Sequence, residues 1–478
     1  MALWMKLDKT RILHRRIEEK SGYIMSKKKD MYIDYKRYYK KRGRRRRLPR
    51  VIILAVVIIC VIIGAYLAIR MRIDPEAFLR KSNGTTQGEL KEDNSEVEQL
   101  VSEVVHSNPA PELAPPQPSI TITATPTPAP TLVPVIEEAV EVMETSIPVR
   151  VKGIYVTSSI AGSNRMKDLI SLADTTEINA MVIDIKDDHG KITYKMENAL
   201  AKEIGATTNT IRDIEALISE LKSKNIYLIA RIVTFKDPLL ADLRRDLAIL
   251  KKDGSLYQDN NGEGWVNPYD RRVWEYLIEV ASQAALIGFD EIQFDYIRFS
   301  TGNGIAEADF GVEAKEKTKE EIILEFTKYA YEKLKPLGVY VSADVYGAII
   351  NSSVDAGLVG QNYVEMAKYL DYICPMIYPS HFGEGNYGIE YPDLEPFNII
   401  NKALSASREK LMEIPEEDHK AIVRPWLQDF TATWIKKHMK YGGEELREQI
   451  RGVEAAGYSE WLLWNAGCDY SEDGLLPE

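Results

Sequence analysis

Short apolar runs alternate with amphipathic stretches from residue 149 to the C-terminus. The runs are rich in Val, Ile and Tyr, which is typical of strands buried on both faces. The stretches between them, ten to twenty residues long, have helical spacing. This alternation of strand and helix predicts a parallel sheet. The eight candidate strands are residues 151–157, 180–186, 226–234, 290–299, 339–346, 372–378, 421–428 and 460–466.

The intervening helical patterns agree with this interpretation. Several end in a glycine just before the next strand, at Gly288, Gly338 and Gly457, where a left-handed helix cap is expected. Eight strand–helix units over about 330 residues predict an α/β protein with a (β/α)8 TIM barrel. The alternative is an open doubly wound sheet, which normally has fewer strands and a glycine-rich phosphate loop after the first. The segment Gly162–Asn164 after the first candidate strand is not such a loop.

A different pattern occupies residues 51–69, which form an apolar run of 19 residues without a charge. As a helix this run spans about 28 Å, close to the hydrocarbon thickness of a bilayer. Eight Lys and Arg residues lie just before it, between residues 40 and 50, and only Arg70 and Arg72 lie just after it. The positive-inside rule therefore predicts a single-pass transmembrane helix in the cell membrane, with residues 1–50 as a basic cytoplasmic tail and the rest of the chain extracellular. A nucleic-acid patch is the competing interpretation of the basic run, and its place against an apolar 19-mer disfavours that.

Charge and composition extend this picture. The first 50 residues carry +14, which leaves −25 for the rest of a chain whose total is −11. Residues 70–148 lack sustained periodicity and include a stretch dominated by Pro, Thr and Ala at 109–134. Such composition predicts a disordered extracellular linker of polyproline character, and those 26 residues would reach roughly 80 Å. The expected organisation is thus a tail (1–50), a span (51–69), a linker (70–148) and a barrel (149–478).

The chemistry of a TIM barrel lies at the carboxyl ends of its strands, so the polar and aromatic residues there are the candidates. Acids, arginines and aromatic residues gather at these positions, a mixture suited to glycoside hydrolysis because carboxylates act on acetals and aromatic faces stack on sugar rings. The residues concerned are Tyr155, Thr157, Asp184, Lys186, Asp187, Asp188, His189, Arg231, Gln293, Asp295, Arg298, Asp344, Tyr346, Met376, Tyr378, His381, Arg424, Trp426, Gln428, Asp429, Trp464 and Asn465.

Three aspartates are the predicted catalytic residues. Asp295 and Asp344 lie on neighbouring strands, so that their carboxyl groups are expected within about 5–10 Å, the range for a retaining or inverting pair. Asp184 is in phase on the second strand. Structural interpretations stay open for each: Asp295 paired with Arg298 or Arg231, Asp344 as a helix cap or cation ligand, and Asp184 neutralised by Lys186.

The predicted substrate-binding residues surround these acids. Arg231, Arg298 and Tyr378 are expected to position the sugar, and Trp426 and Trp464 to stack on it, although ordinary packing is an equal alternative for both tryptophans. The last two predicted substrate contacts are His381 and Asn465, and solvation is an alternative for His381.

The cysteines Cys60, Cys374 and Cys468 have no zinc-like spacing. We predict no metal site and no cofactor, with a structural cation near the acidic loops as an open alternative. The predicted partners are a polysaccharide and, through residues 51–69, the membrane; no nucleic-acid partner is expected.

Six motifs in this order resemble a bacterial family of envelope-associated TIM-barrel proteins classed among the glycoside hydrolases. They are VKGIYVTSS, VIDIKDDHG, GFDEIQFDYIRFS, PMIYPSHF, RPWLQDF and WLLWNAG, and the resemblance covers roughly residues 150–475. It implies a sugar-processing fold.

Two more distant resemblances differ over the catalytic acid. In the alpha-amylase clan an Asp ends strand 4 and a Glu ends strand 5; Asp295 matches the first, whereas Asp344 stands in place of the second. The chitinase pattern DGxDxDxE also resembles the fourth strand, with Ile297 at the position of its catalytic Glu. This implies that substrate-assisted chitinase chemistry is absent.

These departures leave two rivals to a hydrolase. One is an inactive glycan-binding barrel that serves as an envelope scaffold. The other is a different barrel enzyme, either a metal-dependent deacetylase or an aldolase with Lys186 as its Schiff-base lysine.

Overall fold

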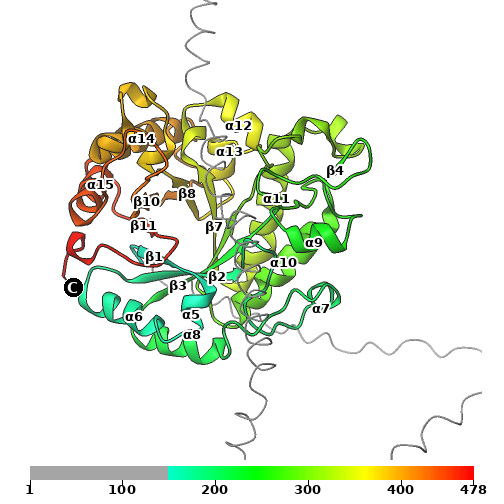
Figure 1. The fold of residues 1–478 in the computed structure, drawn as a ribbon, viewed down its shortest axis with the longest axis horizontal. Helices are drawn as coiled ribbons and strands as arrows, with labels where there is room; N and C mark the ends of the chain where they lie inside the picture. Colours follow the sequence, from blue (N-terminus) through cyan, green and yellow to red (C-terminus); the bar gives the residue numbers. More distant parts are fainter. Residues whose placement is uncertain (1–148, 478) are drawn as a thin grey trace, which may run out of the picture. The chain divides into compact units, whose positions relative to one another are not determined.

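Eight parallel strands close into a barrel in the computed structural model, which describes residues 149–477 (Figure 1). The seventh stave consists of two short strands, and every predicted strand is present. In chain order the staves are β1 (Lys152–Val156), β2 (Ala180–Lys186), β3 (Tyr227–Val233), β5 (Glu291–Asp295), β7 (Tyr340–Tyr346), β8 (Tyr372–Met376), β9 (Ile422–Val423) with β10 (Trp426–Gln428), and β11 (Trp461–Trp464).

The barrel closes through β10, which pairs with β8 on one side and with β11 on the other, while β11 pairs with β1. The seventh stave is split at Arg424 and Pro425, because proline has no N–H to donate to a ladder. The predicted TIM barrel is thus confirmed for the described residues, and the open sheet is excluded there.

Helices surround the barrel where the sequence pattern predicts them. They include α6 (Met166–Thr175), α8 (Ile214–Ser223), α10 (Arg271–Leu286), α11 (Lys319–Leu334) and α15 (Gly443–Ala455). The helices between them are α5 (Ser158–Ala161), α7 (Ala199–Glu203), α9 (Pro238–Leu243), α12 (Ser353–Val359), α13 (Tyr363–Ala367) and α14 (Pro396–Leu411). The three predicted cap glycines all have positive φ, from +78° to +114°.

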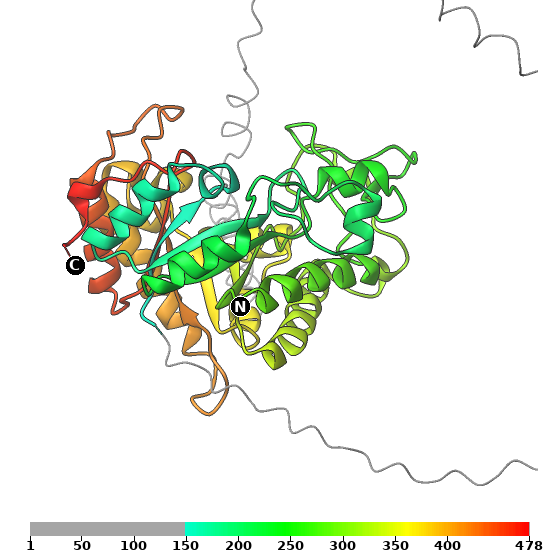
Figure 2. The ribbon, with the colours of Figure 1, turned by 90° about the horizontal axis from the view of Figure 1, so that it is seen from below.

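Two long loops leave the carboxyl ends of β3 and β5 and pair with each other. Their short strands, β4 (Leu250–Lys251) and β6 (Ala308–Asp309), form an antiparallel ladder in which Leu250 is opposite Asp309. Figure 2 shows this green excursion beyond the strand ends. The loops therefore build one wall of the barrel mouth.

The opposite end of the barrel is closed by a charged network around Arg424. Its Nη1 donates to both Glu291 carboxylate oxygens at 2.9 Å, and its Nε donates to Glu460 at 2.9 Å. The guanidinium lies 3.6 Å from the centre of the Tyr372 ring, and Arg424 and Glu291 are fully buried. The prediction that Arg424 lies at the mouth is wrong: Pro425 and the split stave leave it at the amino end.

Within residues 149–477, no helix is both long and apolar enough to cross a bilayer. The predicted tail (1–50), span (51–69) and linker (70–148) lie outside the described residues.

Candidate active site

Arg231 lies at the centre of the mouth and joins two of the predicted catalytic acids. Its Nη1 donates to Asp184 at 2.6 Å, while Nε and Nη2 donate to one oxygen of Asp295 at 3.0 and 2.5 Å. The register brings them together: Asp184 on β2 pairs with Arg231 on β3, and Asp295 on β5 pairs with Val233 two residues further along β3. Arg231 is only 1% exposed, so this pairing fixes both carboxylates without water between them.

Asp184 is buried and accepts a second short hydrogen bond. The Tyr155 hydroxyl donates to its other oxygen at 2.6 Å. Burial, assisted by the nearby charge of Asp188, raises the pKa of Asp184 to about 6, although Arg231 and Tyr155 act in the opposite direction. Asp184 therefore changes protonation in the range where acid–base catalysis operates.

Lys186 does not neutralise Asp184, contrary to one alternative from the sequence. Its ammonium group lies 2.8 Å from Asp237 and donates to the Val233 carbonyl at 2.7 Å, with no exposed surface. An aldolase needs a lysine that reaches its substrate, so the geometry of Lys186 argues against the Schiff-base alternative.

Asp344 and Asp295 occupy corresponding levels of adjacent strands, because Ala343 on β7 pairs with Phe294 on β5. One oxygen of Asp344 accepts a hydrogen bond from the Trp426 indole at 2.6 Å. Burial and the negative charge of Asp295 raise the pKa of Asp344 well above its usual range. Asp344 is therefore a carboxyl group that keeps its proton beside an arginine-bound carboxylate.

The two predicted tryptophan platforms differ in accessibility. Trp426 is 1% exposed, so its ring has no free face for a sugar and its role is to contact Asp344. Trp464 is half-buried and stacks on Tyr155, with ring centres 4.1 Å apart at 22°. Stacking on a substrate stays a prediction for Trp464 alone.

Arg298 is buried inside the wall rather than exposed in the mouth. Its guanidinium lies 4.6–5.0 Å from the ring centres of Trp265, Tyr296 and Tyr346, and its Nη1 donates to the Phe299 carbonyl at 2.9 Å. These contacts indicate that Arg298 holds the aromatic wall together.

The remaining predicted substrate contacts lie on loops around the mouth. Tyr378 is buried and meets His381 edge-on at 5.1 Å, while His381 is half-buried. Asn465 donates to the carbonyls of Asp429 and Asp469 at 2.6 Å each, so its amide hydrogens hold the loop after β11. The structure does not test whether any of the three touches a substrate.

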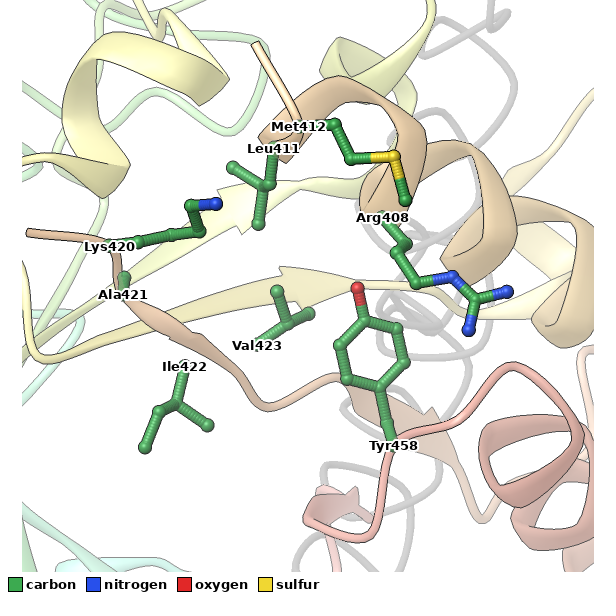
Figure 3. A pocket seen from close by; sticks show the side chains of 8 residues that line it. All are labelled: Arg408, Leu411, Met412, Lys420, Ala421, Ile422, Val423 and Tyr458. Atoms are coloured by element: carbon green, nitrogen blue, oxygen red, sulfur yellow. The ribbon is translucent and has the colours of Figure 1, made fainter. Parts of the chain in front are cut away.

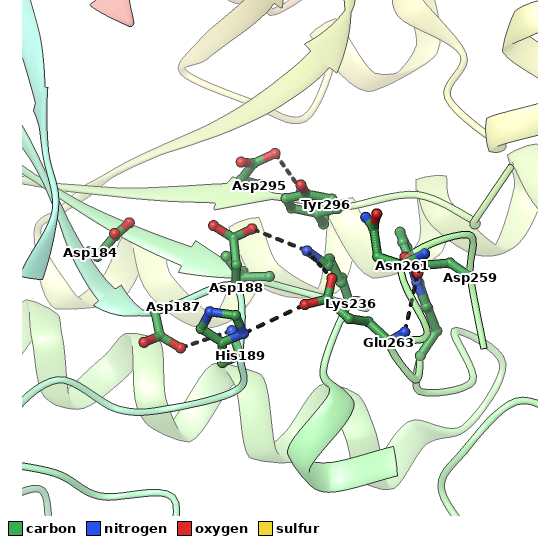
Figure 4. Close-up of polar contacts among 12 residues, drawn as sticks. Asp184, Asp187, Asp188, His189, Lys236, Asp259, Asn261, Glu263, Asp295 and Tyr296 are labelled. Atoms are coloured by element: carbon green, nitrogen blue, oxygen red, sulfur yellow. Dashed lines mark hydrogen bonds and ion pairs between the residues drawn. The ribbon is translucent and has the colours of Figure 1, made fainter. Parts of the chain in front are cut away.

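A second charged group beside the acids was not predicted as a unit (Figure 4). Lys236, which follows β3, lies 2.9 Å from Glu263 and 3.7 Å from Asp188. Tyr296 directly follows Asp295 with φ of +51°, a strained backbone that turns its ring towards Lys236, 4.9 Å away. Glu263 belongs to the long loop after β3, so no strand periodicity pointed to it.

The described residues contain no candidate metal-binding group. Within residues 149–477, no three His, Cys, Asp or Glu side chains are grouped so that they could hold a metal ion.

A hollow of about 350 Å³ lies elsewhere, against the amino end of β9 (Figure 3). It is lined by the end of α14, by residues 420–423 and by Tyr458. The acids lie at the carboxyl ends of their strands, so this hollow is separate from the candidate site.

Two solved structures are similar to this chain. A hypothetical protein from Ruminiclostridium thermocellum is 41% identical, with 40% of this chain and 97% of that chain covered and a TM-score of 0.38. The PgaB (BpsB) glycoside hydrolase domain from Bordetella bronchiseptica is 13% identical, with 69% and 99% covered and a TM-score of 0.50. At that identity the second likeness shows a shared fold. Among curated proteins, no sequence matches this chain.

The family comparison covers nearly the whole barrel. Residues 153–470 match the family described as "Putative glycosyl hydrolase domain". This confirms the resemblance seen in the six motifs. The chain belongs to that family of glycosyl hydrolase-like domains.

Proposed function

We propose that this barrel is a glycoside hydrolase that cleaves an extracellular or cell-wall polysaccharide. One observation carries the proposal: Asp295, held by Arg231, lies at the same end of adjacent strands as Asp344, whose pKa is raised well above its usual range by burial and by the charge of Asp295. Glycosidic cleavage requires two carboxyl groups in one site, one of which donates a proton. Family membership and the fold shared with a glycoside hydrolase domain support it.

Asp295 is the nucleophile or base in this proposal. Arg231 holds one of its oxygens, and the backbone N–H of Tyr296 donates to the other at 2.6 Å. These donors orient the carboxylate either to attack the anomeric carbon or to accept a proton from the attacking water molecule.

Asp344 is the proton donor. Its raised pKa keeps a proton available for the leaving oxygen, and the Trp426 N–H holds one carboxyl oxygen in place. Asp184 is a third carboxyl group, tied to the same arginine, and we assign it the role of positioning Arg231.

The site is proposed to act outside the cell. The apolar run at 51–69 and the basic residues before it support a single-pass anchor with its N-terminus in the cytoplasm. Protease treatment of intact cells tests this: the barrel should be released while a tag at residue 1 stays protected.

One departure from known patterns favours the alternative of an inactive glycan-binding scaffold. Ile297, at the position of the chitinase glutamate, is 1% exposed and packs in the core. The deciding experiment incubates the full-length protein with wall glycan and exopolysaccharide preparations and measures new reducing ends. Release that depends on Asp295 and Asp344 supports hydrolysis, whereas binding without release, unaffected by Asp295→Asn, supports the scaffold.

A further inference from the structure

A group of aromatic side chains lies just outside the acid site, on the loops that follow β8 and β10. Phe430 and Trp434 stack with ring centres 5.8 Å apart at 22°. Tyr378 meets Phe430 edge-on at 5.9 Å, and His381 meets both Tyr378 and Phe430. We call Tyr378, His381, Phe430 and Trp434 the aromatic platform.

The platform lies in line with the catalytic acids. Trp426, which bonds to Asp344, pairs across strands with Met376. Tyr378 lies two residues beyond Met376, and Phe430 lies four beyond Trp426. Tyr378 and Phe430 thus follow the carboxyl ends of β8 and β10, the end of the barrel at which the acids lie. The platform therefore lies on loops at the mouth.

Large apolar rings are usually buried, yet Phe430 and Trp434 are only half-buried. Figure 2 shows their orange loop standing out beyond the strand ends at the top of the view. Aromatic rings that are only half-buried near the acid site are suited to the C–H faces of sugar rings.

The loop that carries the platform is fixed at its base by the buried Asp393. Its carboxylate accepts from the Gln428 side chain at 3.1 Å and from the Met439 N–H at 3.2 Å, and its carbonyl accepts from the Tyr441 hydroxyl at 3.0 Å. Gln428 also accepts from the Ser380 N–H at 3.0 Å, which joins the loop to the His381 segment. The base of the loop is therefore fixed before any ligand arrives, which lowers the entropic cost of ordering the loop on binding.

We propose that the aromatic platform is a glycan-binding subsite that stacks sugar rings beyond the bond to be cleaved. This inference rests on the proposed function for the identity of the ligand as a glycan. It implies a polymeric substrate whose chain extends from Asp344 across Phe430 and Trp434, so that affinity increases with the number of sugars. The proposal therefore predicts that a substrate of two sugars occupies the acid site without contacting the platform.

The test measures binding of the full-length protein, in mild detergent, to fluorescent disaccharides and hexasaccharides. Three chemical classes serve as probes: β-linked glucose, β-linked N-acetylglucosamine and a uronic acid. Wild type should bind at least one hexasaccharide more tightly than its disaccharide. Trp434→Ala should weaken hexasaccharide binding about tenfold and change disaccharide binding less than twofold.

Two variants serve as controls. Trp434→Phe keeps an aromatic face and should retain most of the affinity. Tyr329→Ala removes a half-buried aromatic ring from α11, on the outside of the barrel, and should leave the affinity for both the hexasaccharide and the disaccharide unchanged. Hexasaccharide binding that is unchanged in both Trp434→Ala and Phe430→Ala overturns the platform, as does a wild-type protein that binds none of the hexasaccharides.

Cleavage separates this inference from the proposed function. If hexasaccharide binding depends on Trp434 while no reducing ends form, the platform stands and the hydrolase fails. If cleavage depends on Asp295 while Trp434→Ala binds and cleaves the hexasaccharide normally, the hydrolase stands and the platform fails.

Discussion

The indole N–H of Trp426 donates a hydrogen bond to Asp344 across 2.6 Å in the interior of the barrel. The bond favours the charged form of Asp344, but burial and the charge of Asp295 outweigh it, and the pKa of Asp344 stays well above its usual range. Trp426 thus orients a protonated acid without removing its proton. The Trp426 ring is buried, so it cannot stack on a sugar.

The first prediction concerns Asp344→Asn. Above about pH 4 the unfolded chain releases the Asp344 proton while the folded chain retains it, so the wild type loses stability as pH rises towards the raised folded pKa. Asparagine has no such proton and can still accept from Trp426. The melting temperature of the variant, relative to wild type, should therefore increase between pH 4 and pH 7. A difference that stays constant over this range contradicts the assignment.

Asp295→Asn should reduce the rate of glycan cleavage on the order of 10³-fold, because the amide is neither a nucleophile nor a base. Asp290→Asn is the matched control. Asp290 lies just before the same strand, at its amino end, where it accepts from the Leu228 N–H at 2.9 Å. Initial rates of reducing-end release should separate the two, and equal rates would remove Asp295 from the mechanism.

Tyr155→Phe should change how activity depends on pH. The Tyr155 hydroxyl stabilises ionised Asp184, so its removal should raise the pKa of Asp184 above about 6. The acidic limb of the pH–rate profile should therefore move to higher pH if Asp184 must be ionised to position Arg231. The control is Tyr194→Phe, because the buried Tyr194 hydroxyl has no hydrogen-bond partner among the described residues. An unmoved limb for Tyr155→Phe contradicts the role of Asp184.

Arg424→Met should destabilise the fold by about 3–5 kcal/mol, because it leaves the buried Glu291 and Glu460 carboxylates unpaired. Calorimetry should show a clear fall in melting temperature. Adding Glu291→Gln and Glu460→Gln to the same chain should recover part of the loss. If Arg424→Met alone were as stable as wild type, the network around Arg424 would contribute little to the free energy of unfolding.

The strands were predictable because their apolar runs are long enough to distinguish strand from helix. The regular alternation of strands and helices also indicates the order of the strands in the sheet. Asp184, Arg231 and Asp295 were predictable for a related reason: each interrupts an apolar strand, and parallel register brings them together. Their ion-pair partners were not predictable, because the sequence places both Lys186 and Arg231 on the same or a neighbouring strand as Asp184. The fold sends Lys186 to Asp237, a residue on the loop after the next strand.

Residues on loops were the hardest to predict. Phe430 and Trp434 follow the end of a strand, where neither period applies, and their positions depend on Asp393 from another loop. Arg424 was assigned to the wrong end because the split at Pro425 was not foreseen. The burial of Trp426 and its contact with Asp344 were not predictable, because both arise only when the barrel closes.

The charged network around Arg424 gives the barrel a floor. If the proposed function is correct, a polymer chain cannot pass through the barrel, because this network closes the amino end. Substrate and cleavage products must then both enter and leave at the carboxyl end of the strands.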